Sequence, residues 1–337
     1  MEDIRIHKLM TVISHISYHI PVLKYYSSQI KSKGIKRIIQ KTGIDKKFKA
    51  KKNEYATDLA VKAINKILKK NVNLKKKIDF LIYCSQSPDF VLPSGSSFIQ
   101  KKVFKNKNIP AIDISLGCSG FVYSLFLANG LLKSNSCKKI LLVTSDTYSK
   151  YIDDRDLTNR LIFGDGSSAC ILEKSDTDFM NFSQGTDGSG IHDLFVINSG
   201  LRKINIDNYK NIKSKKLIMN GLKLFDFSVS MVPKLIKENL KKNKLKLKEV
   251  DLFILHQANA QMLQNIRDKL NIDKKNFYIN LKDKGNTTSS SIPIAIAETI
   301  KSNILKKNMK VNLCGFGVGL SWSSTIIKFK KIPKTYS

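Results

Sequence analysis

Two segments of the chain repeat one plan, and this repeat decides the fold class. They are "CSGFVYSLFLANGLLKSNSCKKILLVTSD" (118–146) and "NTTSSSIPIAIAETIKSNILKKNMKVNLCGFG" (286–317). Each begins with small polar residues, continues with a helical pattern and ends in an apolar run of strand length. An offset of 168 superposes their "KSN" triplets and places Cys118 on Asn286. The repeat indicates a duplicated fold in which these two residues precede equivalent helices.

A second pair of segments supports the duplication. "LKKKIDFLIYCSQ" (74–86) and "LKLKEVDLFILHQAN" (245–259) share a lysine-rich start, an acid and an apolar strand, and an offset of 172 lays Cys84 on His256. Apolar residues recur at helical spacing over 54–70 and 224–242. Helices that alternate with buried strands, twice over, predict an α/β protein of layered sheets around a pseudo-twofold axis. The turn-rich stretch 175–215 is expected to join the halves.

The net charge is the most unusual feature of the composition. The 337 residues include 59 Lys plus Arg against 27 Asp plus Glu, which gives +32. Such a charge permits nucleic-acid binding. Only six of the basic residues are arginines, however, and the lysines are dispersed among many asparagines and isoleucines. We interpret the charge as solvated lysine on the surface, with attraction of an acidic partner protein as a second explanation.

The cysteine pattern indicates a reducing compartment. Five cysteines lie far apart, and no CxxC pair occurs. This pattern favours free thiols in the cytoplasm and disfavours a cysteine zinc site. Acids at positions 2 and 3 and the lack of an apolar run of about 18 residues predict neither a targeting sequence nor a membrane span.

Three residues stand where chemistry is expected. Cys118 precedes a helix, whose positive end would lower the pKa of the thiol, although buried cysteines are often inert. His256 follows an apolar strand, and its alternative role is that of a hydrogen-bonded core residue. Asn286 lies in a glycine-containing turn, where capping a helix is the alternative. The histidines of "HISYH" (15–19) lack the glutamate of a zinc motif, so no metal site is predicted.

The segment "CGFGVGLSW" (314–322) is superficially similar to a dinucleotide-binding loop. It precedes the strand-like run "SSTIIKF" instead of a helix, so the phosphate-binding geometry is missing. Its glycines let backbone N–H groups approach a substrate oxygen, as in an oxyanion hole.

Taken together, four motifs resemble one enzyme family. "DISLGCSGF", "HQANAQM", "KGNTTSSSIP" and "CGFGVGLSW", in that order, are similar to the beta-ketoacyl-acyl-carrier-protein synthase III family of thiolase-like condensing enzymes. The resemblance runs from about residue 10 to 330. It implies a thiolase-like fold of two βαβαβαββ halves (1–175 and 176–337) in α-β-α-β-α layers, and a homodimer.

The resemblance also implies a reaction and a set of site residues. Cys118 would carry an acyl group from a thioester, with the backbone N–H groups of Cys118 and Val318 as the oxyanion hole. A malonyl thioester would then lose carbon dioxide while His256 and Asn286 donate hydrogen bonds to its carbonyl oxygen. No metal or redox cofactor is implied. The substrates would be thioesters of CoA or of acyl carrier protein, which is the expected protein partner.

Further positions follow from the resemblance with less direct support. Substrate-binding positions would be Leu92, Asn259, Phe316, Gly317, Arg37 and Lys41. Leu157 stands where acetyl-CoA users have an arginine, so the CoA site is incomplete. Gln261 replaces a carrier-docking arginine, although Arg267 and Lys269 follow. Leu92 would floor the acyl pocket of the partner subunit, and its size predicts a primer longer or more branched than acetyl.

Two other functions stay open from the sequence. One is an acyltransferase of the same fold that passes the acyl group of Cys118 to an alcohol or amine without condensation. The more remote one is a basic nucleic-acid-binding protein, because the charge of +32 permits it.

Overall fold

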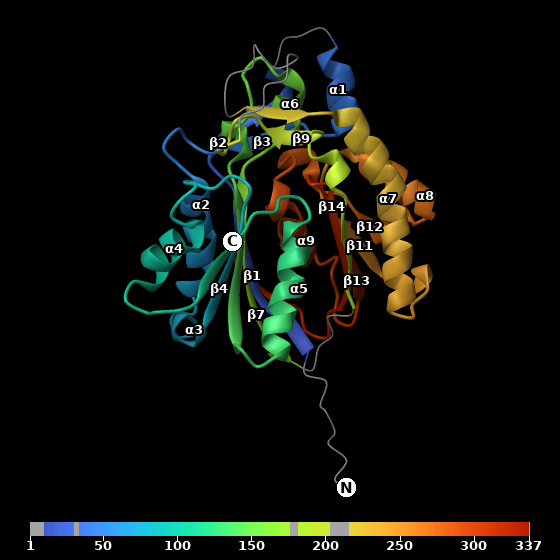
Figure 1. Ribbon diagram of the computed structural model, residues 1–337. Coiled ribbons are helices and arrows are strands. Elements are labelled where there is room, and N and C mark those ends of the chain that lie inside the picture. The colour runs from blue at the N-terminus through green and yellow to red at the C-terminus, as the bar shows by residue number, and fades with distance from the viewer. Residues whose placement is uncertain (1–9, 30–33, 176–180, 203–215, 337) are drawn as a thin grey trace.

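The chain forms two mixed sheets with helices between and outside them, as the computed structural model shows for residues 10–29, 34–175, 181–202 and 216–336 (Figure 1). The first sheet contains β1 (Met10–His19), β4 (Phe80–Cys84), β5 (Ala111–Ile114), β6 (Lys139–Asp146), β7 (Gly166–Ser175) and β15 (Lys334–Tyr336). The second contains β8 (Ser183–Thr186), β11 (Leu252–Leu255), β12 (Phe277–Tyr278), β13 (Lys310–Gly317) and β14 (Ser321–Lys328). The remaining strands form two small antiparallel sheets of two strands each. One contains β2 (Leu23–Tyr26) and β3 (Lys46–Lys49), and the other contains β9 (Leu194–Val196) and β10 (Leu217–Met219).

Helices occupy the stretches with a predicted helical pattern, which are 54–70, 224–242 and the segments after Cys118 and Asn286, and they also occur at positions without such a prediction. They are α1 (Ile35–Thr42), α2 (Ala56–Leu68), α3 (Val72–Lys77), α4 (Gly95–Ile99), α5 (Gly120–Lys133), α6 (Leu157–Ile162), α7 (Gly221–Lys242), α8 (Ala260–Leu270) and α9 (Ser291–Lys301). Among the described residues, no helix is long and apolar enough to cross a membrane.

The strand order confirms the duplication. The sheets run β15-β1-β7-β6-β4-β5 and β12-β11-β13-β14-β8. In the first, β6 pairs antiparallel with β7 and parallel with β4, which pairs parallel with β5. In the second, β13 pairs antiparallel with β14 and parallel with β11, which pairs parallel with β12. Since β7 also pairs antiparallel with β1, and β14 with β8, five strands of each half correspond, while β15 from near the end of the chain joins the first sheet.

The segment expected to join the halves contains more regular structure than its turn residues indicate. Strand β8 forms an edge of the second sheet, and β9 pairs with β10. The proposed division between residues 175 and 176 meets the stretch 176–180, which lies outside the described residues, as does 203–215.

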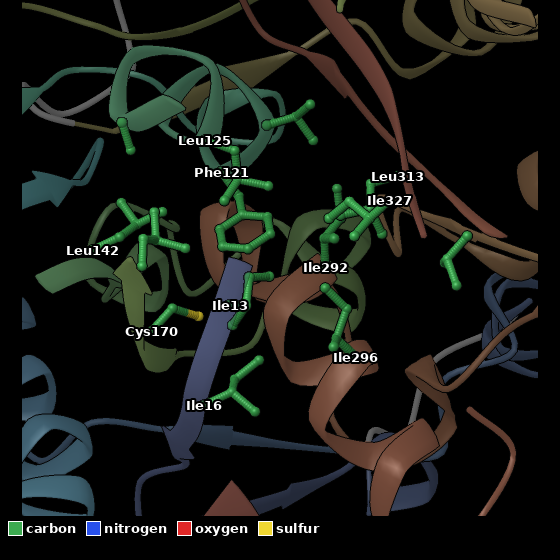
Figure 2. Packing of buried hydrophobic residues seen from close by; sticks show 14 of the residues in the cluster. Ile13, Ile16, Phe121, Leu125, Leu142, Cys170, Ile292, Ile296, Leu313 and Ile327 are labelled. Atoms are coloured by element: carbon green, nitrogen blue, oxygen red, sulfur yellow. The ribbon is translucent and has the colours of Figure 1, made fainter. Parts of the chain in front are cut away.

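Helices α5 and α9 lie side by side between the two sheets, while α2, α3 and α4 cover one outer face and α7 and α8 the other (Figure 1). This is the five-layer arrangement expected of a thiolase-like fold. The layer between the sheets is apolar because α5 and α9 are hydrophobic on nearly all sides. Phe121 of α5 packs there against Ile13 of β1 and Ile292 of α9 (Figure 2).

We predict that Phe121→Ala lowers the free energy of unfolding by about 3–5 kcal/mol, because it leaves a cavity between the sheets. Leu127 lies on the same helix but is 41% exposed, so Leu127→Ala is the matched control and should cost much less. Urea unfolding followed by circular dichroism measures both. Equal losses for the two variants would contradict this view of the core.

Candidate active site

A cavity of about 210 Å³ brings the three predicted residues together. Cys118 comes from the turn before α5, His256 from the end of β11, and Asn286 from the turn that leads to α9. The offsets found in the sequence explain this meeting, since duplicated elements place their ends around one axis. One detail differs: the turn Thr288–Ser290 separates Asn286 from α9, so Asn286 does not cap that helix.

The Cys118 thiol is buried and protonated. Burial, followed by the negative charge of Asp146, raises the pKa of Cys118 to about 12, while the backbone N–H groups of Cys118 and Val318 act in the opposite direction. The sequence-based expectation of a lowered pKa is therefore wrong. The start of α5 at Gly120 is close, but loss of hydration is the largest influence on the pKa of Cys118.

The backbone of β13 approaches Cys118 closely, which explains the glycines of "CGFGVG". A Cβ atom on Gly317 would lie 2.7 Å from the Cβ of Cys118, and one on Gly315 would lie 2.7 Å from the carbonyl oxygen of Cys118. Any side chain at either position would push the strand away from the nucleophile. The close approach brings the Val318 N–H group to the sulfur, on the side where the oxyanion hole is predicted.

His256 is held as a neutral hydrogen-bond donor. Its Nδ1 lies 2.7 Å from Ser291 Oγ, which also accepts a hydrogen bond from Gln257 N at 3.4 Å. We assign the Ser291 hydroxyl as the donor to Nδ1, and this assignment places the ring proton on Nε2. Burial lowers the pKa of His256 to about 3, so the ring is uncharged at neutral pH. The Phe316 ring packs edge-on against the imidazole, with ring centres 5.7 Å apart.

Asn286 is also oriented as a donor. Its Oδ1 accepts a hydrogen bond from Thr288 N at 2.9 Å, which assigns the amide orientation and leaves Nδ2 to donate toward the cavity that Asn286 lines. Its backbone is fixed as well, since Asn286 N donates to Ile162 O and Gly164 N donates to Asn286 O.

The other predicted substrate-binding residues divide into two groups. Asn259, Phe316 and Gly317 line the cavity, and Asn259 Oδ1 also caps α8 by accepting from Met262 N at 2.8 Å. Arg37 and Lys41 are exposed on α1 and do not line the cavity. Leu92 is 84% exposed, away from the cavity of its own chain, so its predicted role in a partner subunit stays a prediction.

Sequence reasoning missed the residues that orient the donors and most of the apolar wall. Ser291 and Thr288 belong to the run "TTSSS", whose density of hydroxyl groups next to Asn286 was the available signal. The apolar wall includes Leu194, Met219 and Leu224, which come from segments with no motif, together with Phe163 and with Met262, the last residue of "HQANAQM". Among the described residues, no group of His, Cys, Asp or Glu side chains could hold a metal ion.

Family comparison links the chain to one kind of enzyme. The family model described as "3-Oxoacyl-[acyl-carrier-protein (ACP)] synthase III" matches residues 112–188, and the one described as its C-terminal part matches residues 240–329. The chain is 37% identical over 298 residues to "Beta-ketoacyl-[acyl-carrier-protein] synthase III" of Clostridium tetani, covering 86% of this chain and 88% of the relative. A Staphylococcus epidermidis relative, "Beta-ketoacyl-[acyl-carrier-protein] synthase III 2", is 35% identical with 87% and 89% coverage.

Solved structures show the same fold. A crystal structure of a 3-oxoacyl-(acyl-carrier-protein) synthase III superposes with a TM-score of 0.90 at 33% identity, covering 95% of this chain and all of that one. A 3-oxoacyl-(acyl-carrier protein) synthase from Burkholderia xenovorans LB400 gives a TM-score of 0.91 at 28% identity, with 97% of both chains covered.

The buried thiol predicts a steep pH dependence of alkylation. With a pKa of about 12, the thiolate fraction of Cys118 should rise about tenfold for each pH unit between pH 7 and 9. Iodoacetamide labelling of Cys118, followed by peptide mass spectrometry, measures the rate. A rate that is already constant across this interval would show that the thiol ionises at neutral pH and would contradict the prediction.

Proposed function

The chain belongs to the 3-oxoacyl-[acyl-carrier-protein] synthase III family, and on that premise we propose that Cys118, His256 and Asn286 catalyse its reaction. The enzyme is an acyltransferase that makes a 3-oxoacyl thioester by decarboxylative condensation of an acyl thioester with a malonyl thioester. What supports this assignment of residues is that one nucleophile and two oriented neutral donors line a single cavity.

The first half-reaction transfers an acyl group to Cys118. The sulfur forms a bond to the acyl carbon, the carbon–sulfur bond of the donor thioester breaks, and the proton lost by Cys118 goes to the departing thiol. In the tetrahedral intermediate, the oxyanion would accept hydrogen bonds from the backbone N–H groups of Cys118 and Val318. These preorganised donors offset the cost of ionising a thiol whose pKa is raised.

The second half-reaction uses the two side-chain donors. As the malonyl carboxylate leaves as carbon dioxide, its bonding electrons move into the thioester, and negative charge develops on the carbonyl oxygen. His256 Nε2–H and the Asn286 amide would stabilise that oxygen, each by roughly 3 kcal/mol. The resulting carbanion attacks the acyl carbon on Cys118, the new carbon–carbon bond forms as the bond from that carbon to the Cys118 sulfur breaks, and the released Cys118 thiolate takes up a proton from solvent.

Plain acyl transfer to an alcohol or amine explains the site less well. That reaction needs the nucleophile and the oxyanion hole. It gives no role to an Asn286 amide whose orientation is fixed by Thr288. Condensation uses all three side chains. Cys118 carries the acyl group, and His256 and Asn286 stabilise the negative charge that develops on the carbonyl oxygen of the malonyl thioester.

We further propose an acidic acyl carrier protein as substrate carrier and partner. The relatives are named for this carrier, and a net charge of +32 attracts an acidic protein. Gln261 and Lys269 are exposed on α8, whose first turns line the cavity, and Arg37 and Lys41 are exposed on α1, which contacts α8. These residues mark the surface proposed for docking.

A homodimer is proposed through the edge of the first sheet. Among the described residues, strand β5 pairs with β4 alone, which leaves the other edge of β5 open. Beside it, the loop residues Phe90, Val91 and Leu92 are exposed, although large apolar side chains in a row favour burial in an interface. The loop leads into α4, whose first N–H groups donate to Asp113 of β5.

The reaction needs neither electron transfer nor a Lewis acid, so we propose that it uses no metal or redox cofactor. All five cysteines are free thiols. This state supports a reducing compartment such as the cytoplasm.

Release of labelled carbon dioxide from malonyl-carrier protein tests the proposed function. Asn286→Ala should still be acylated on Cys118 but should release carbon dioxide roughly 100-fold more slowly, because one oxyanion donor is lost. Cys118→Ser should form no condensation product. The exposed Asn73→Ala on α3, away from the proposed docking surface, serves as the matched asparagine control. Wild-type protein that releases no carbon dioxide, or Asn286→Ala with the wild-type rate, would contradict the assignment.

A further inference from the structure

Thr288, two residues after Asn286, has an unusual backbone conformation. Its φ angle is 48°, in the left-handed region, which β-branched residues rarely adopt. A strained residue next to a functional side chain persists only where its surroundings hold it in place.

Two hydrogen bonds hold Thr288, one from each of its polar groups. Its N–H donates to Asn286 Oδ1 at 2.9 Å, and its hydroxyl donates to Asp146 Oδ2 at 2.5 Å. The next residue binds the same carboxylate oxygen, because both the N–H and the hydroxyl of Ser289 donate to Asp146 Oδ2. The orientation of the Asn286 amide thus depends on a turn that is anchored to Asp146.

Asp146 belongs to the other half of the molecule. It ends β6, is fully buried, and its Oδ1 accepts hydrogen bonds from Gln86 N at 2.8 Å and Ser87 Oγ at 3.1 Å. Both donors follow β4, the strand next to β6. One oxygen therefore binds the N-terminal half and the other binds the turn beside Asn286, so the carboxylate couples the geometry of the two halves.

The negative charge of Asp146 also affects the pKa of the nucleophile, Cys118. After burial itself, this carboxylate is the largest contribution to the raised pKa of Cys118. A change at Asp146 should therefore alter two properties, the orientation of Asn286 and the ionisation of Cys118, whereas a change at Thr288 should alter only the first.

We propose, building on the proposed function, that Asp146 is a positioning residue that holds the strained Thr288 turn so that the Asn286 amide faces the malonyl carbonyl oxygen during decarboxylation. Thr288 transmits this constraint through its hydroxyl and its N–H group. Neither residue is assigned a bond to the substrate.

The test compares Thr288→Ala with Thr288→Ser, which keeps the hydroxyl. In Thr288→Ala, carbon dioxide release from malonyl-carrier protein should fall roughly tenfold to 100-fold, because the donor is misplaced. Acylation of Cys118 by an acyl thioester should stay within about twofold, and the pH profile of Cys118 alkylation should not move. Thr288→Ser should restore most of the carbon dioxide release.

The Asp146→Asn variant tests, in addition, how the charge of Asp146 affects the ionisation of Cys118. It should reduce carbon dioxide release as Thr288→Ala does, and it should also shift the alkylation profile of Cys118 to lower pH, since a negative charge is removed. The Thr288 pair carries the test if Asp146→Asn does not fold.

Three outcomes would overturn the proposal: Thr288→Ala with wild-type carbon dioxide release, failure of Thr288→Ser to restore it, or an equal loss of acylation and decarboxylation in Thr288→Ala. A wild-type enzyme that is acylated but releases no carbon dioxide would instead contradict the proposed function. The alkylation profiles would still decide whether Asp146 acts on Cys118.

Discussion

The packing of α5 and α9 against the two sheets, in one shared apolar layer, is the interaction on which the site depends. Both helices are nearly free of charge within the core, and they bury Phe121 and Ile292 in one apolar layer (Figure 2). Because the two halves repeat one topology, the turns that precede these helices come to the same place. Cys118 and Asn286 stand in those turns, and β11 adds His256 between them. The duplication therefore supplies three chemically different groups at one cavity without any local motif.

Burial keeps the Cys118 and His256 side chains uncharged before substrate arrives. It raises the pKa of Cys118 and lowers that of His256, so the thiol is protonated and the imidazole uncharged. A neutral imidazole suits the role of hydrogen-bond donor, which needs a fixed proton on Nε2 and no ionisation. Burial makes ionisation of the Cys118 thiol unfavourable, although the thiol must lose its proton during attack. The close approach of Gly317 and Val318 offsets part of this cost by placing backbone donors where negative charge develops.

Much of this arrangement could be predicted from the sequence, because it follows from local patterns. The apolar runs predicted the strands β4, β6, β11 and β13, and the offset of 168 related Cys118 to Asn286. The ionisation of Cys118 could not be predicted, because it depends on Asp146 and on burial by residues far along the chain. The same limit applies to Ser291, whose role rests on a contact 35 residues away from it. Arg37 and Lys41 were placed by resemblance alone, and they lie on an exposed helix outside the cavity.

The most direct test of the account is the mass of the Cys118 peptide after exposure to a panel of acyl-CoA and acyl-carrier-protein thioesters. The proposed mechanism predicts one acyl group on Cys118 and none at this position in Cys118→Ser. When malonyl-carrier protein is added, that group should leave Cys118 as part of a 3-oxoacyl thioester. An acyl group bound to a different residue, or an unmodified Cys118 across the whole panel in a folded enzyme, would contradict it.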